Sequence, residues 1–111
     1  MRFRPGDVVK VPFPSKARAT RQRRPALVVS AEGLERDHGL VWVLMITSAE
    51  NRPWPGDVVF NAAQAGLPAP SVVRTAKIAT LDAAYAEPVG RLSDAEMERV
   101  AVCIRAGLDL A

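Results

Sequence analysis

The chain has 111 residues, of which 49% are apolar and 24% charged, a composition typical of a globular protein with one core. This length is too short for two cores, so residues 1–111 are expected to form a single domain. A single cysteine, Cys103, excludes an internal disulfide and a multi-cysteine zinc site. Neither a membrane span nor a secretory signal is recognisable, so a cytoplasmic protein without a membrane partner is expected.

The net charge of +3 is unevenly distributed along the chain. Residues 1–24 hold eight cations and one acid, a net charge of +7, whereas residues 25–111 hold seven cations and eleven acids, a net charge of −4. Such an uneven distribution favours an anionic partner that binds the N-terminal part of the chain. The alternative is a solvated basic loop that binds nothing.

The first half of the sequence predicts three strands. Residues 6–12 alternate loosely and end at Pro-Phe-Pro, which predicts a strand stopped by prolines. The basic residues 15–23 show no apolar periodicity and predict a loop, before a second strand over 24–30 with Pro25 near its start. Turn signals fill 31–39. The apolar run "LVWVLMIT" at 40–47 is typical of a strand buried on both faces, with Trp42 in the core.

The second half predicts shorter strands and a helix. A fourth strand is expected over 54–60, then one helical turn closed by Gly66, one or two short strands around 71–80, and a last strand in "EPVGRL". Residues 93–107 predict an amphipathic helix with a capping box formed by Ser93 and Glu96. Short strands followed by a helix predict a mainly β fold, a small closed or half-closed antiparallel sheet with a C-terminal α-helix.

Cations and hydroxyls are the strongest candidates for chemistry. The only histidine, His38, lies in a turn-like stretch, the carboxylates do not cluster, and no cofactor motif is present, so no metal or cofactor is expected. Arg24, Arg74 and Lys77 lie at or in predicted strands. Thr47 and Ser48 end the apolar strand. These side chains suit a phosphate whose charge grows during a reaction, although each could instead form an ion pair or a strand-end hydrogen bond.

A family resemblance runs from Arg4 to about Leu110. The motifs "GDVVKVPFP", "RRPALVVS", "MITS", "GDVVF", "AGLPAPSVVRTAKIATLD" and "GRLSDAEMERV" resemble, in order, those of the MazF/PemK toxins of type II toxin–antitoxin systems. The resemblance implies an SH3-like barrel of the CcdB/PemK/MazF type, usually a homodimer. It also implies a metal-independent, sequence-specific endoribonuclease that cleaves single-stranded mRNA. The products would carry 2′,3′-cyclic phosphate and 5′-hydroxyl ends.

The resemblance also assigns residues and partners. It makes Arg24 and Thr47 catalytic, with Thr47 either binding the phosphate or relaying a proton. Basic, hydroxyl and aromatic side chains are expected to bind RNA: Lys16, Arg18, Arg21, Arg23, Ser48, Trp54, Arg74 and Lys77. Phe13 and Trp54 are the candidate stacking platforms. Some family members carry an acid where this chain has Ala76, so no acid–base role is carried over to that position. The expected protein partner is an antitoxin with an acidic, partly disordered tail.

Two other functions remain open on the sequence. A CcdB-like toxin would share the fold but poison DNA gyrase without cleaving RNA. A non-catalytic SH3-like module would bind nucleic acid only. Arg24 and Thr47 favour the ribonuclease over the CcdB-like toxin.

Overall fold

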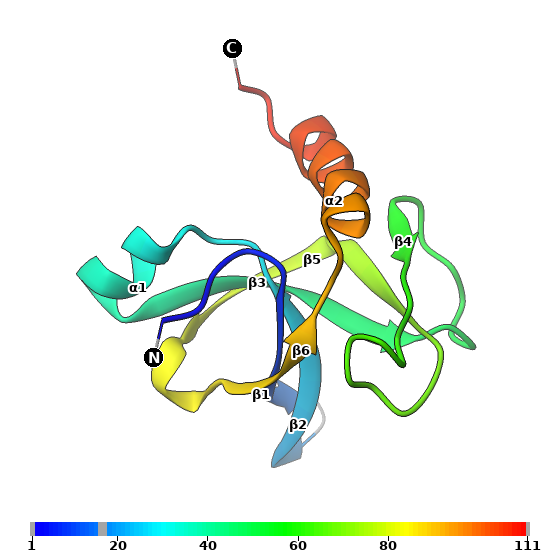
Figure 1. Ribbon diagram of the computed structural model, residues 1–111. Helices are drawn as coiled ribbons and strands as arrows, with labels where there is room; N and C mark the ends of the chain where they lie inside the picture. The colour runs from blue at the N-terminus through cyan, green and yellow to red at the C-terminus, as the bar shows by residue number, and fades with distance from the viewer. Residues whose placement is uncertain (1, 16–17, 111) are drawn as a thin grey trace.

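A computed structural model describes residues 2–15 and 18–110, with side chains described outside residues 13–22. Within these residues, six strands form one antiparallel sheet in the order β4-β5-β3-β2-β1-β6 (Figure 1). The strands are β1 (Asp7–Ser15), β2 (Arg18–Val28), β3 (Leu40–Ser48), β4 (Asp57–Val59), β5 (Ser71–Asp82) and β6 (Glu87–Arg91). The helices are α1 (Glu32–His38), the single-turn η1 (Ala83–Tyr85) and α2 (Asp94–Gly107). The predicted mainly β fold with a C-terminal helix is confirmed.

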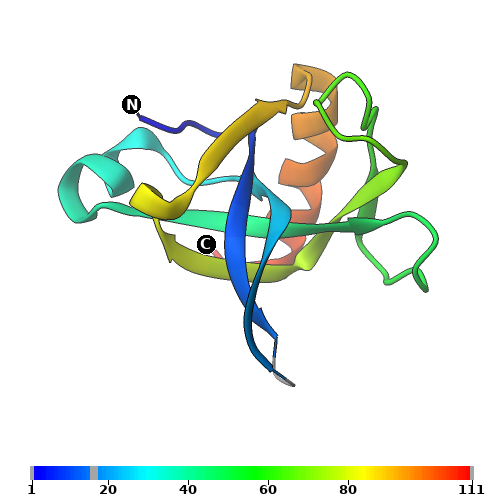
Figure 2. The ribbon, with the colours of Figure 1, turned by 90° about the horizontal axis from the view of Figure 1, so that it is seen from below.

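The sheet curls on itself but is not closed. Its edge strands are β4 and β6, and no ladder between them is present among the described residues (Figure 2). The β1–β2 ladder extends beyond the segments of these strands that pair with β6 and β3. This leaves Arg23 and Arg24, at the middle of β2, at the border between the sheet and solvent.

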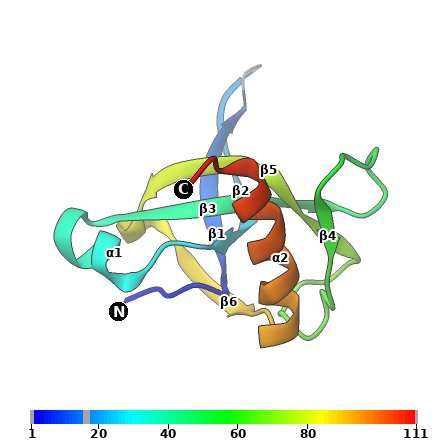
Figure 3. The ribbon, with the colours of Figure 1, turned by 90° about the horizontal axis from the view of Figure 1, so that it is seen from above.

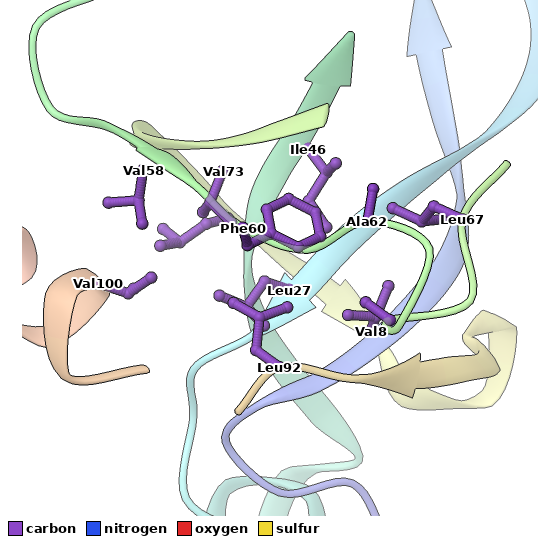
Figure 4. Packing of buried hydrophobic residues seen from close by; sticks show 12 residues of the cluster. Val8, Leu27, Ile46, Val58, Phe60, Ala62, Leu67, Val73, Leu92 and Val100 are labelled. Carbon is purple, nitrogen blue, oxygen red and sulfur yellow. The ribbon is translucent and has the colours of Figure 1, made fainter. Parts of the chain in front are cut away.

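Hydrophobic residues cover both faces of the central strands. On the face that α2 covers, residues from β1–β5 and the 60–67 turn form one cluster with Val100 of α2. Figure 4 shows Val100 on one side of this cluster, and Val8 and Leu67 on the other. Neighbouring residues of the same strands, such as Val9, Val28 and Val43, form a second cluster on the opposite face. The central strands are therefore held from both sides, which fixes the ends that carry the candidate site.

The predicted capping box starts α2. The Glu96 N–H donates to Ser93 Oγ at 3.2 Å, and the Ser93 N–H donates to Glu96 Oε1 at 2.8 Å. Glu96 Oε2 also accepts the Asn61 N–H at 2.7 Å, which ties the start of the helix to the turn after β4. Figure 3 shows α2 crossing the sheet near β4 and β5. The N-terminal cap therefore also helps to place the 61–67 turn, which leads into the candidate site.

The predicted loop at 15–23 is wrong for the residues that the structure describes. Residues 16–17 lie outside that part of the chain, whereas Ser15 ends β1 and residues 18–23 belong to β2. The predicted stop at the prolines fails because Pro12 and Pro14 alternate along β1. Pro25 of β2 pairs with Lys10, which lies two residues before Pro12 and therefore has the same orientation in the β1–β2 ladder. All three missing N–H groups can therefore point away from the partner strand, where no ladder bond is lost.

Three other local predictions need correction. The turn at 31–39 contains α1, which has no buried residue and therefore no apolar stripe to reveal it. Residues 71–82 form one strand of 12 residues, so the single strand among the predicted one or two is confirmed but is longer than expected. Trp42 is 46% exposed rather than in the core. Its side chain lies on the face of Leu44 and Ile46 but outside the cluster that packs on α2.

Candidate active site and nucleic-acid interface

Arg24 and Thr47 lie on one pocket, as the sequence suggests. Ala26 of β2 pairs with Met45 of β3, and the same register continued by two residues places Arg24 opposite Thr47. The pocket has a volume of about 370 Å³ and is lined from β1, β2, the end of β3 and the segment before β5. Its lining residues are Lys10, Arg23, Arg24, Pro25, Ile46, Thr47, Ser48, Leu67, Pro68, Ala69, Pro70 and Ser71.

A smaller pocket of about 60 Å³ adjoins the same two residues. Arg24 and Thr47 line it together with Met45, Ile46, Arg74 and Lys77. Its shape depends on an irregularity in β5: Ile78 pairs with Leu44, but Arg74 pairs with Met45, so residues 75–77 have no partner on β3. This bulge allows both Arg74 and Lys77 to line the pocket although they are three residues apart. Arg24 and Thr47 therefore stand between two pockets.

The hydroxyl groups at the end of β3 are held by the loop that follows. Thr47 Oγ1 accepts a hydrogen bond from Asn51 Nδ2 at 2.6 Å. Ser48 Oγ accepts the Glu50 N–H at 3.2 Å. Across the larger pocket, Ser71 Oγ donates to the Ala69 carbonyl at 2.9 Å. Thr47 is half-buried whereas Ser48 is exposed, so Thr47 is the more firmly positioned hydroxyl of the two.

Arg74 forms a buried ion pair, the alternative that the sequence leaves open for it, with a partner, Asp57, that the sequence does not reveal. Its Nε and Nη2 donate to the two carboxylate oxygens of Asp57 at 3.2 and 3.1 Å, and Nη2 also donates to the Arg52 carbonyl at 2.8 Å. The guanidinium lies 4.3 Å from the centre of the Trp54 ring, and Lys77 Nζ lies 5.6 Å from it. Both side chains of the pair are about nine-tenths buried. The guanidinium of Arg74 thus donates its hydrogen bonds to groups of the protein itself. This favours a structural role over the phosphate contact expected from the sequence.

The Arg74 contacts also set the acidity of Asp57. Burial raises the pKa of this carboxyl, but the hydrogen bonds from Arg74 and the Trp54 N–H, with the charge of Arg74, lower it further than burial raises it. The pKa of Glu96 is shifted in the same way, because burial is outweighed by the hydrogen bonds from Asn61 and Ser93 and by the charge of Arg99. Both pKa values end below their ordinary values of 3.8 and 4.5.

These shifts predict acid destabilisation. A carboxyl whose pKa is lower in the folded state adds stability above its unfolded-state pKa, and that stability is lost as the pH falls through the folded-state value. The free energy of unfolding, measured in urea, should therefore decrease as the pH falls below about 4. The variants Asp57→Asn and Glu96→Gln should be less stable than the wild type at pH 7, and the difference should shrink as the pH falls through the lowered folded-state pKa values. A stability difference that does not change with pH would contradict these assignments.

The other residues predicted to bind RNA differ in their position and in whether the structure describes them. Arg23 lines the larger pocket, but its Nη2 lies 3.3 Å from Glu87 Oε1 and donates to the carbonyls of Tyr85 and Lys10 at 3.1 and 3.3 Å. Lys16 lies outside the described residues. The side chains of three further residues lie outside the described part of the chain: Phe13, Arg18 and Arg21. Trp54 is 39% exposed, so part of its surface is accessible beside Arg74.

Several pocket residues were not identified from the sequence. Lys10 lies in β1 and appears only as one cation among many, yet it lines the larger pocket. The Leu67–Pro70 segment forms one wall of the pocket and reads in sequence as an ordinary proline turn. Asn51 bonds Thr47, but a polar residue in a loop carries no local signal of that contact. Such placements depend on strand pairing and loop path rather than on local pattern.

The described part of the chain shows neither a set of metal ligands nor a carboxylate or imidazole at the two pockets. No three His, Cys, Asp or Glu side chains there are arranged to hold a metal ion. The residues lining the two pockets, as far as the structure describes them, include no carboxylate and no imidazole. None of the described helices is both long and apolar enough to span a bilayer.

The fold and the pocket define a class: a small curved β-sheet protein with an open, cationic, hydroxyl-bearing pocket suited to phosphate groups. The family model for PemK-like, MazF-like toxins of type II toxin–antitoxin systems matches residues 4–108. The chain therefore belongs to this toxin family. It matches no curated protein sequence.

Solved structures of the family share the fold. A MazF structure from Deinococcus radiodurans superposes with a TM-score of 0.80 at 23% identity, covering 99% of this chain and 99% of that one. The Mycobacterium tuberculosis toxin MazF-mt6 gives a TM-score of 0.73 at 24% identity over 97% and 99% of the two chains. A mycobacterial endoribonuclease solved with its cognate antitoxin gives a TM-score of 0.75 at 18% identity, covering 99% of this chain and 96% of that one. At these identities the likeness establishes the fold.

Proposed function

We propose that this toxin is a metal-independent, sequence-specific endoribonuclease that cleaves single-stranded mRNA. One observation carries the proposal: Arg24 and Thr47, which come from different strands, line the same two pockets in a chain of the MazF-like family. A structural relative is described as an endoribonuclease, which supports the same activity here.

The proposed reaction is an internal transesterification of the RNA. The 2′-oxygen of a ribose bonds to the adjacent phosphorus as the bond from phosphorus to the 5′-oxygen of the next nucleotide breaks. The 2′-hydroxyl loses its proton and the leaving 5′-oxygen gains one, so the products are a 2′,3′-cyclic phosphate and a 5′-hydroxyl. Because the substrate supplies the nucleophile, the protein must mainly position the phosphate and stabilise its growing charge.

Arg24 and Thr47 suit these two tasks. The guanidinium of Arg24 offers parallel donors to phosphate oxygens, and the Thr47 hydroxyl can donate one more hydrogen bond. Ser48, Ser71 and Lys10 line the same pocket and would contact the flanking ribose-phosphates. The role proposed for Arg74 is to hold the loop that carries Trp54. Lys77 lines the smaller pocket and remains a proposed phosphate contact.

The proposed macromolecular partners follow from charge and exposed apolar surface. Residues 1–24 carry a net charge of +7, which suits both mRNA and the acidic, partly disordered tail of an antitoxin. Structural relatives include MazE–MazF complexes from Deinococcus radiodurans. Trp42 and Ile78 are 46% and 60% exposed on the face of the sheet that α2 partly covers, which supports a homodimer. Action on mRNA would place the protein in the cytoplasm.

Cleavage of a long RNA tests the activity. Purified protein is incubated with single-stranded RNA in EDTA, and the ends of the fragments are mapped and analysed chemically. Discrete cuts with cyclic phosphate and 5′-hydroxyl ends are expected. RNA that stays intact at high protein concentration would overturn the proposal and favour a gyrase poison or a binding module. Sedimentation of the same protein should show a dimer.

A further inference from the structure

The hydrogen bond between Asn51 and Thr47 restricts where the threonine hydroxyl can point. A hydroxyl group has one hydrogen to donate and two lone pairs that can accept. The Asn51 amide donates to Thr47 Oγ1 at 2.6 Å, so one lone pair is occupied. The hydroxyl hydrogen must then point away from Asn51. Since Thr47 lines both pockets, its hydrogen can be directed at a phosphate oxygen there.

Asn51 is held in place from both ends of its loop. On the β3 side, its own N–H donates to the Ser48 carbonyl at 3.1 Å, and the Ala49 N–H donates to the Pro70 carbonyl at 3.0 Å. On the other side, the neighbouring Arg52 carbonyl accepts from Arg74 at 2.8 Å.

The far end of the loop is fixed as well. Thr75 Oγ1 donates to the Gly56 carbonyl at 2.7 Å, and Asp57 pairs with the buried Arg74 directly across the β4–β5 ladder. Both contacts come from β5. The segment from Ser48 to Asp57 is therefore braced against β5 at several points. A short side chain in such a segment can orient a neighbour at little further entropic cost.

We propose that Asn51 is a positioning residue that makes Thr47 a hydrogen-bond donor to the scissile phosphate, with the Arg74–Asp57 pair as the anchor of its loop. The inference rests on the proposed ribonuclease function and deepens it. It favours one of the two roles that the sequence leaves open for Thr47. With one lone pair occupied by Asn51 and its hydrogen directed at the phosphate, Thr47 acts as a donor that stabilises charge there.

Three variants test the role of Asn51. Asn51→Ala removes the donor and should lower kcat for an oligonucleotide spanning a mapped cut by about tenfold, with KM nearly unchanged. Asn51→Asp can only accept, so it draws the hydroxyl hydrogen out of the pocket and should lower kcat further. Asn61→Asp makes the same chemical change at the other asparagine and keeps the Oδ1 that accepts the Gln64 N–H. It should cleave like the wild type.

A double-mutant cycle separates positioning from a general effect on the loop. In a Thr47→Val protein, Asn51→Ala should cause no additional loss of the residual cleavage, because the hydroxyl it would orient is absent. Melting curves of the Asn51 variants should match the wild type, since Asn51 is exposed. Wild-type kcat in Asn51→Ala, or an equal loss in both backgrounds, would overturn the role of Asn51 while leaving the ribonuclease intact. Wild-type protein that leaves RNA uncut would instead overturn the proposed function, and the role of Asn51 with it.

Discussion

Arg24→Ala should lower the rate of RNA cleavage at least about 100-fold and leave the fold unchanged. The reason lies in the position of the side chain. Arg24 lines both pockets next to Thr47, and its backbone is fixed by the β1–β2 ladder, in which it pairs with Val11. A guanidinium held there can meet the phosphate as negative charge grows without first being ordered. The expected losses are measured as kcat on an oligonucleotide that spans a mapped cut, with urea unfolding as the check on stability.

Two further variants show whether the effect is specific. Arg36→Ala removes the same charge from the exposed helix α1, so it measures the loss of long-range attraction for RNA and should change cleavage little. Arg24→Lys keeps the charge but not the planar fork, so its activity should lie between those of Arg24→Ala and the wild type. Cleavage by Arg24→Ala at the wild-type rate would show that another residue carries the reaction.

The two residues that both pockets share, Arg24 and Thr47, could be singled out from the sequence because their signals are local. Arg24 stands beside Pro25 at a strand boundary, and Thr47 ends a continuous apolar strand; both features are visible in the sequence and match the family motifs. The structure then adds what no local pattern contains. The β2–β3 register, continued two residues beyond its last pair, places the two residues opposite each other, and the bulge at 75–77 brings Lys77 to the smaller pocket that they line.

Predictions were incomplete or wrong where a residue's partner lies far along the chain. Arg74 reads as one more strand cation, but its carboxylate partner is 17 positions away, and only the pairing of β4 with β5 brings them together. Trp42 reads as core, but how far α2 extends over the sheet decides which apolar residues stay exposed. The prolines of β1 read as a stop, although their alternation makes them compatible with a ladder. Local propensity cannot settle these cases because tertiary contacts decide them.

The buried Arg74–Asp57 pair should be the most costly polar contact to break. Asp57→Ala leaves the Arg74 guanidinium buried without its carboxylate, and the free energy of unfolding should fall by about 3 kcal/mol or more. Asp37→Ala is the matched control, because Asp37 pairs with Arg36 on the surface, where both side chains are about 60% exposed. That substitution should change stability by no more than about 0.5 kcal/mol. Urea unfolding at neutral pH gives both values.

A double variant then separates stability from the geometry of the site. Asp57→Val combined with Arg74→Met replaces both charges by apolar side chains, so it should be more stable than the sum of the two single losses predicts. Cleavage should nevertheless stay about tenfold low, because the Arg52 carbonyl and Trp54 have lost the guanidinium that anchors their loop, and Asn51 no longer holds Thr47 as firmly. If cleavage recovers together with stability, the pair stabilises the fold but does not position Thr47. If Asp57→Ala is as well tolerated as Asp37→Ala, the ion pair is not a structural anchor at all.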